Sequence, residues 1–214
     1  MESRRLGVQI PPKAYKLLKK FNKKFKTKMR EFLLFSRQGY TSGSFRNLKE
    51  ARLDLVAHSL TSSFFLSHAL RKDVVFHIVL SGPPNPPVYI KVVGAELYNV
   101  RSDEETWGRI LRIVLNKEKH EGFYLEKKSF QGVIKDLTNE GKRFLVLEEK
   151  GEDILKYKLK GNEVFVLGDF IGLPKKEEGF VLRNGDKISL GKKAYLAADC
   201  ITILNFVMDK FYKY

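Results

Sequence analysis

Short runs of almost purely apolar residues alternate along this chain with segments that are apolar on one side only, and this alternation limits the fold more than any other feature. Two of the runs read "DVVFHIVL" (residues 73–80) and "EVFVLGD" (residues 163–169). They are rich in β-branched and aromatic residues and are too short for helices. Strands of this kind are buried on both faces, which is typical of a parallel sheet covered by helices.

The same patterns predict the other elements. Strands are expected for "REFLLFS", "VYIKVVG", "RFLVLEE" and "DKISLG", and one-sided apolar stripes predict helices over residues 12–27, 53–64, 129–137 and 200–211. Ser102 and Glu105 have the spacing of a capping box at the start of a further helix that ends near Leu115. Strands that alternate with helices predict an α/β fold with a mostly parallel sheet and helices on both faces.

Charge indicates a polyanionic partner. The net charge is +15, and residues 1–28 alone hold ten Lys or Arg and one acid. Nucleic acid is the simplest partner, because each neutralised phosphate releases counterions. The basic helix at residues 12–27 can bind RNA phosphates or an anionic membrane, or it can simply dock with its lysines in solvent. No apolar stretch is long enough to span a bilayer, so we expect no membrane-embedded segment.

The chain lacks the common signatures of nucleotide enzymes and metal sites. It has no GxGxxG, no Walker lysine motif and no metal-ligand spacing among its four histidines, so we expect no metal. Its single cysteine suits a reducing, cytoplasmic location. The apolar run at 163–169 ends in Gly168-Asp169, and ligands of α/β sheets bind where strands end. We therefore expect a ligand site built from backbone at several strand ends.

Several blocks of the sequence resemble one known family. "MREFLLFS", "ARLDLVAHSLTSSFFLSHALRKDVVFHIVLSGPPNPPVYIKVVGAEL", "VFVLGDFIG" and "ISLG…AADCITILNFVMDK" are similar to the archaeal tRNA pseudouridine-54 N1-methyltransferases of the SPOUT superfamily. The resemblance runs from Met29 to about Lys210, so residues 1–28 are an extension before a domain at 29–214. It implies a trefoil knot in the C-terminal part, S-adenosylmethionine (SAM) bound within the knot, tRNA as substrate, and a homodimer in which the last helix meets its partner.

The resemblance also implies site residues. Its cofactor loops fall on Leu147, Gly168, Leu190, Gly191, Lys192, Lys193, Ala194, Tyr195 and Cys200. Gly168 is expected to lay bare backbone against the cofactor, and Asp169 to hold the turn. Core packing is the alternative for Leu147, Leu190 and Cys200.

The intact "RLD" makes Asp54 the candidate base or imide-orienting group, with Arg52 beside it. The alternative for Asp54 is a first-turn acid of the helix or an ion-pair partner of Arg52. Arg52, Arg71 and Lys72 are candidates for phosphate contacts, and Asn85 for shaping the base pocket; each can instead be solvated surface.

Two rival functions stay open at this point. One is a related SPOUT methyltransferase that acts on pseudouridine in ribosomal RNA. The other is an RNA-binding protein that keeps the knot and carries out no reaction. Binding of SAM separates the second rival from both enzymes.

Overall fold

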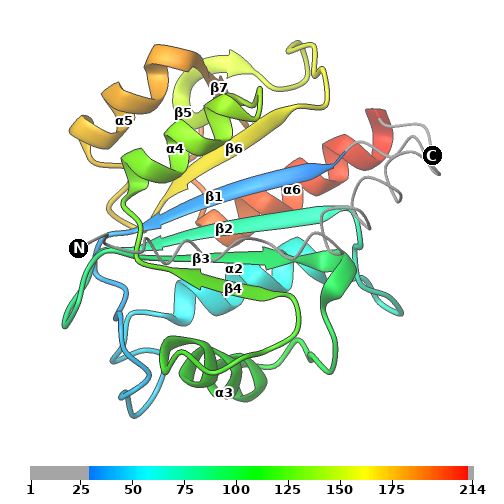
Figure 1. Ribbon diagram of the computed structural model, residues 1–214. Helices are drawn as coiled ribbons and strands as arrows, with labels where there is room; N and C mark the ends of the chain where they lie inside the picture. The colour runs from blue at the N-terminus through cyan, green and yellow to red at the C-terminus, as the bar shows by residue number, and fades with distance from the viewer. Residues whose placement is uncertain (1–28, 212–214) are drawn as a thin grey trace.

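A seven-stranded sheet organises residues 29–211, which are the residues that the computed structural model describes (Figure 1). The strands are β1 (Arg30–Ser36), β2 (Val74–Leu80), β3 (Val88–Val93), β4 (Phe123–Glu126), β5 (Arg143–Asp153), β6 (Glu163–Gly168) and β7 (Gly185–Ser189). Their order is β4-β3-β2-β1-β6-β5-β7. The helix expected over residues 12–27 lies outside the described residues.

The sheet is mostly parallel, as the sequence predicts. β2, β1, β6, β5 and β7 run in the same direction, whereas β3 is antiparallel to β2 and β4 is antiparallel to β3. Only residues 81–87 join β2 to β3. A parallel pair needs a crossover of a dozen or more residues, so this short connection requires an antiparallel pair.

Helices cover both faces of the sheet (Figure 1). They are α2 (Asp54–Phe64), α3 (Glu104–Leu115), α4 (Phe130–Asn139), α5 (Lys175–Val181) and α6 (Ala197–Phe211). On one face the core joins Phe32, Phe76 and Phe165 to α2, α3 and α6; on the other, Leu33 and Val166 pack with α4 and α5. Successive strand residues point to opposite faces, and both faces are buried. This explains why the central strands consist of long, nearly continuous apolar runs.

Three details differ from the sequence-based expectation. The cap of α3 is Asp103, not Ser102: the Asp103 carboxylate accepts a hydrogen bond from the Thr106 backbone N–H at 2.7 Å. A carboxylate at this position also interacts favourably with the helix dipole, which favours it over the neighbouring hydroxyl. The strand β4 and the helix α5, with its 3₁₀ extension η2 (Leu182–Asn184), were not predicted, because four and seven residues are too few to establish a period.

The parallel strands give the sheet two chemically different ends. We call the end at which β1, β2, β6 and β7 finish the carboxyl end, and the opposite one the amino end. The loops that follow these parallel strands, and the start of α2, gather at the carboxyl end. Among the described residues, no helix has the length and apolar character needed to cross a membrane.

Candidate functional site

A cavity of about 690 Å³ lies at the carboxyl end of the sheet. It is lined by residues 147–150, 167–172, 190–191 and 193–197, together with Leu55 and Cys200. All the residues predicted to bind the cofactor are in this lining except Lys192. Loops that follow β5, β6 and β7 thus meet where a parallel sheet is expected to bind its ligand. A volume of this size suits a small organic molecule.

Asp169 fixes the loop that follows β6. One oxygen of its buried carboxylate accepts the backbone N–H of Arg37 at 2.8 Å, and the other accepts that of Ile171 at 3.0 Å. The backbone N–H of Gly172 also donates to the Asp169 carbonyl oxygen at 2.8 Å. The expectation that Asp169 holds the turn is confirmed. β1 and the loop after β6 are thereby joined through one carboxylate.

The need for glycine at position 168 arises within this loop. A Cβ on Gly168 would lie 2.2 Å from the backbone carbon of Gly172 and 2.3 Å from the backbone nitrogen of Leu173. Sequence reasoning expected bare backbone against the cofactor at this position. The structure instead has the returning chain of the same loop there, although Gly168 does line the cavity. A larger residue at 168 would therefore displace the loop before it met a ligand.

Gly191 is where bare backbone faces the open cavity. Its φ is +125°, a conformation that side chains rarely adopt, and nothing lies within 4 Å of where its Cβ would stand. The backbone N–H of Gly191 donates to the Ser189 hydroxyl oxygen at 3.0 Å, which ties the loop to the end of β7. A ligand can approach this backbone closely. Gly172, with φ +83°, likewise has no atom within 4 Å of its Cβ position.

Cys200 closes the loop at residues 190–196. Its thiol lies 3.7 Å from the Tyr195 carbonyl oxygen, to which it donates a weak hydrogen bond. Burial, with Asp199 nearby, raises the pKa of Cys200 to about 11. The side chain is therefore mainly a neutral thiol near pH 7.

Arg52 and Asp54 lie at the rim of the cavity. Asp54 is the first residue of α2, and the next residue, Leu55, lines the cavity. The guanidinium of Arg52 stands 4.5 Å from the ring centroid of Phe170. Within residues 29–211, Arg52 and Asp54 form no ion pair with one another. The alternative that Asp54 serves as an ion-pair partner of Arg52 is therefore wrong.

Of the three other candidates for RNA contact, only Asn85 lies at the carboxyl end. It belongs to the loop between β2 and β3: its backbone N–H donates to the Thr41 hydroxyl at 2.9 Å, and its carbonyl oxygen accepts from Lys127 at 2.6 Å. Arg71 and Lys72 come just before β2, so they lie at the amino end, remote from the cavity. Whether a charged residue lies at the amino or the carboxyl end of the sheet depends on whether it precedes or follows its strand.

Arg71 and Lys72 are also engaged with the protein. Both terminal nitrogens of Arg71 bond the Asp209 carboxylate, at 2.9 and 2.6 Å. Lys72 donates to the Leu97 carbonyl oxygen at 3.3 Å. The Arg71 contact joins the segment before β2 to the end of α6, and the Lys72 contact joins it to the residue that follows the 3₁₀ helix η1 (Gly94–Glu96).

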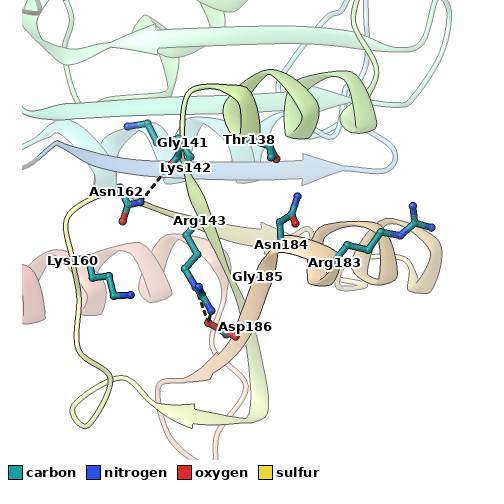
Figure 2. Close-up of a pocket in the computed structure, with 10 residues that line it drawn as sticks. All are labelled: Thr138, Gly141, Lys142, Arg143, Lys160, Asn162, Arg183, Asn184, Gly185 and Asp186. Atoms are coloured by element: carbon teal, nitrogen blue, oxygen red, sulfur yellow. Dashed lines mark hydrogen bonds and ion pairs between the residues drawn. The ribbon is translucent and has the colours of Figure 1, made fainter.

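A second cavity, of about 610 Å³, lies at the amino end where β5, β6 and β7 begin (Figure 2). Its charges are largely compensated: Arg143 pairs with Asp186 at 2.7 Å, and Lys142 pairs with Glu31. In Figure 2, Arg183 extends away from Arg143 and Asp186. These cations do not converge on one point, so the first cavity is the better candidate for the active site.

Comparisons with known proteins agree with this placement. Residues 29–212 match a family model described as "Putative SAM-dependent RNA methyltransferase". The tRNA (pseudouridine(54)-N(1))-methyltransferase of Methanococcus maripaludis strain C5 is 37% identical over 197 residues, which cover 85% of this chain and 99% of the relative. Those of Methanococcus aeolicus and Methanocaldococcus jannaschii are 39% and 36% identical, cover the same share of this chain, and are themselves covered to 98% and 97%.

The fold has a counterpart among solved structures. The crystal structure of Archaeoglobus fulgidus Nep1 bound to S-adenosylhomocysteine has a TM-score of 0.58 at 10% identity, covering 85% of this chain and 98% of that one. At this identity the likeness concerns the fold alone. The sequence relatives and the family model together decide the assignment: the chain belongs to the family of tRNA (pseudouridine(54)-N(1))-methyltransferases, which are SAM-dependent RNA methyltransferases.

Proposed function

We propose that this protein transfers the methyl group of SAM to N1 of pseudouridine 54 in the T-loop of tRNA. The observation that supports this most directly is the cavity at the carboxyl end. Its walls are three loops, one of which offers bare backbone at Gly191, and its rim carries Arg52 and Asp54. The names of the sequence relatives supply the reaction and the substrate.

The cavity fits SAM in its chemistry. Leu147, Leu190 and Tyr195 supply apolar surface for a flat adenine ring, and the missing side chain at Gly191 leaves room for the ring to lie close to the backbone. When bound, SAM supplies an electrophilic methyl group on a sulfonium that already carries the driving charge. The residues of this chain then have two tasks, which are to position the base and to remove a proton.

The proton to be removed is the one on N1 of pseudouridine, which uridine does not have. The base of pseudouridine is joined to ribose through carbon, so N1 carries a hydrogen, whereas N1 of uridine is the glycosidic atom. We assign Asp54 to accept this proton or to orient the imide of the base, and Arg52 to hold the RNA beside it. Asp54 is the first residue of α2, where the helix dipole interacts favourably with a carboxylate.

A homodimer, the trefoil knot and a cytoplasmic location belong to the same proposal. The apolar stripe expected on α6 is largely covered by the core of the same chain, since Leu204, Val207 and Met208 are buried. Phe206, on the outer side of α6, is 58% exposed and is our candidate for the contact with a second copy. Light scattering that gave a stable monomer at micromolar concentration would exclude the dimer.

The decisive experiment uses one tRNA in two forms. Purified protein is incubated with labelled SAM and with tRNA that carries either pseudouridine or uridine at position 54, and nucleosides are identified by mass spectrometry. We expect N1-methylpseudouridine from the first tRNA and no methylation of the second. Equal methylation of both would refute N1 as the target. Failure to bind SAM in calorimetry would favour the alternative of an RNA-binding protein without enzymatic activity. Methyl transfer to ribosomal RNA and not to tRNA would favour the alternative of a ribosomal RNA methyltransferase.

A further inference from the structure

Phe170 is a large apolar side chain displayed to solvent at the rim of the cavity. It is 59% exposed, and its neighbour Ile171 is 48% exposed. Single exposed apolar residues are common on protein surfaces and need no explanation. Phe170 differs because its loop is fixed on both sides by the carboxylate of Asp169, which accepts two backbone N–H groups. The ring is therefore held in a defined place, beside the residues assigned to the reaction.

Arg52 completes the arrangement. Its guanidinium stands over the Phe170 ring at 4.5 Å from the centroid, which leaves much of the residue exposed. Within residues 29–211 this guanidinium makes no hydrogen bond or ion pair, so its N–H donors are available. The backbone of Arg52 has φ +54°, which is uncommon for a residue other than glycine. Such a conformation persists only where the surroundings enforce it, and it is frequent at ligand sites.

We propose that Phe170 is a stacking platform for a nucleobase of the RNA substrate, with Arg52 binding the adjoining phosphate. Bases of single-stranded RNA loops stack on aromatic rings, and a guanidinium with free donors matches the geometry of phosphate. The Phe170 ring thus contacts the base of a nucleotide, and the Arg52 guanidinium contacts its phosphate. The inference rests on the proposed function, because that function brings a tRNA loop to this rim. It gives Phe170, whose loop also lines the cavity, a role in substrate recognition.

Four variants test the platform. Phe170→Leu keeps an apolar side chain and removes the ring, and Phe170→Trp restores a ring. Arg52→Gly removes the guanidinium while keeping the backbone conformation, since glycine adopts positive φ without strain. The matched control is Phe180→Leu, in another Arg–Phe pair, where Arg183 stands 5.2 Å from the ring centroid. Phe180 lies in α5 and does not line the cavity.

The measurements are affinity for tRNA containing pseudouridine 54, affinity for SAM, and the separate values of KM and kcat. We expect Phe170→Leu to weaken tRNA binding by about 5- to 150-fold, the range for loss of one base–aromatic stack. Phe170→Trp should restore most of this loss. Arg52→Gly should lower the slope of log affinity against log salt by about 0.7, the value for one single-stranded phosphate contact. Arg52→Gly and Phe180→Leu should leave SAM affinity unchanged, Phe170→Leu should lower tRNA affinity far more than SAM affinity because Phe170 also lines the cavity, and Phe180→Leu should bind tRNA as the wild type does.

Three results would overturn the platform while leaving the proposed function intact. One is wild-type tRNA affinity in Phe170→Leu. Another is loss of SAM affinity in that variant with unchanged tRNA affinity, which would assign the ring to the cofactor. A third is a dimer that becomes a monomer in Phe170→Leu, which would show that the Phe170 ring belongs to the contact between subunits. Wild-type protein that bound tRNA through Phe170 and transferred no methyl would instead refute the proposed function alone.

Discussion

Replacing Glu31 by glutamine should destabilise this protein strongly at neutral pH and much less in acid. Glu31 is buried in β1 at the amino end of the sheet, and its carboxylate pairs with Lys142. Its second oxygen lies 3.4 Å from His77 Nε2, and His77 Nδ1 lies 2.7 Å from the Tyr89 hydroxyl. Burial lowers the pKa of His77, so near pH 7 a neutral ring donates to Glu31 and accepts from Tyr89.

The size of the effect follows from the pKa of Glu31. Burial alone raises this pKa, but the hydrogen bond to His77 and the charge that His77 takes up in acid, followed by the charge and hydrogen bond of Lys142, outweigh it and lower the value from 4.5 to about 2. Each pKa unit corresponds to about 1.4 kcal/mol, so ionised Glu31 contributes about 3 kcal/mol. Removing one partner of a buried ion pair costs a similar amount, about 3–5 kcal/mol. Because the pKa is depressed on folding, this stability is present above pH 4.5 and is lost as the pH falls toward 2.

The assay is urea unfolding of the wild type and Glu31→Gln at pH 7, 5, 4 and 3. We expect a difference in the free energy of unfolding of about 3 kcal/mol at pH 7 and 5, shrinking steadily at pH 4 and 3. The control is Glu104→Gln, which removes another Glu–His pair at 2.7 Å, but an exposed one that should matter little. A difference for Glu31→Gln that was the same at pH 3 as at pH 7 would refute the reasoning.

Three further predictions concern the cavity and the basic extension. Asp169→Asn should weaken SAM binding about 10-fold or more, because an amide offers one oxygen to two N–H donors and loses a charged hydrogen bond; unchanged calorimetry would contradict this. Gly168→Val should abolish SAM binding by displacing backbone 2.2 Å away, whereas Gly179→Ala, with no atom within 4 Å, should have no effect on binding. Deleting residues 1–28, which hold ten bases and one acid, should lower the salt dependence of tRNA binding and leave SAM affinity unchanged; equal slopes would leave the segment without an RNA role.

Much of the fold could be predicted because burial on both faces leaves a clear signal. β1, β2 and β6 are buried at nearly every position and are mostly apolar, so the sequence predicts their type and approximate extent. β4 and α5 were missed because they are short and half exposed. The direction of β3 follows from its connection to β2 rather than from its own residues.

The site was predicted less evenly than the fold. The cofactor loops came from the resemblance to a family, since Leu147 and Leu190 alone are indistinguishable from core residues. The sequence predicts phosphate contacts for Arg71 and Lys72 and a place in the base pocket for Asn85, but β2 lies between them and carries the chain from one end of the sheet to the other. The sequence does carry a signal for Phe170. This aromatic residue comes directly after the Gly-Asp pair that ends a buried strand, so it belongs to the following loop and not to the core.

The two ends of the sheet differ in how their charges are used, and this difference links stability to function. At the amino end, acids and bases neutralise one another: Glu31 with Lys142, Arg143 with Asp186, and Arg71 with Asp209. Breaking such a pair changes the stability of the fold, while the cavity lies at the far ends of the same strands. At the carboxyl end, Asp169 is used on backbone N–H groups and Arg52 keeps its donors free within the described residues. An unpaired guanidinium does little for folding, so its strained placement is best explained by an anionic ligand that binds there.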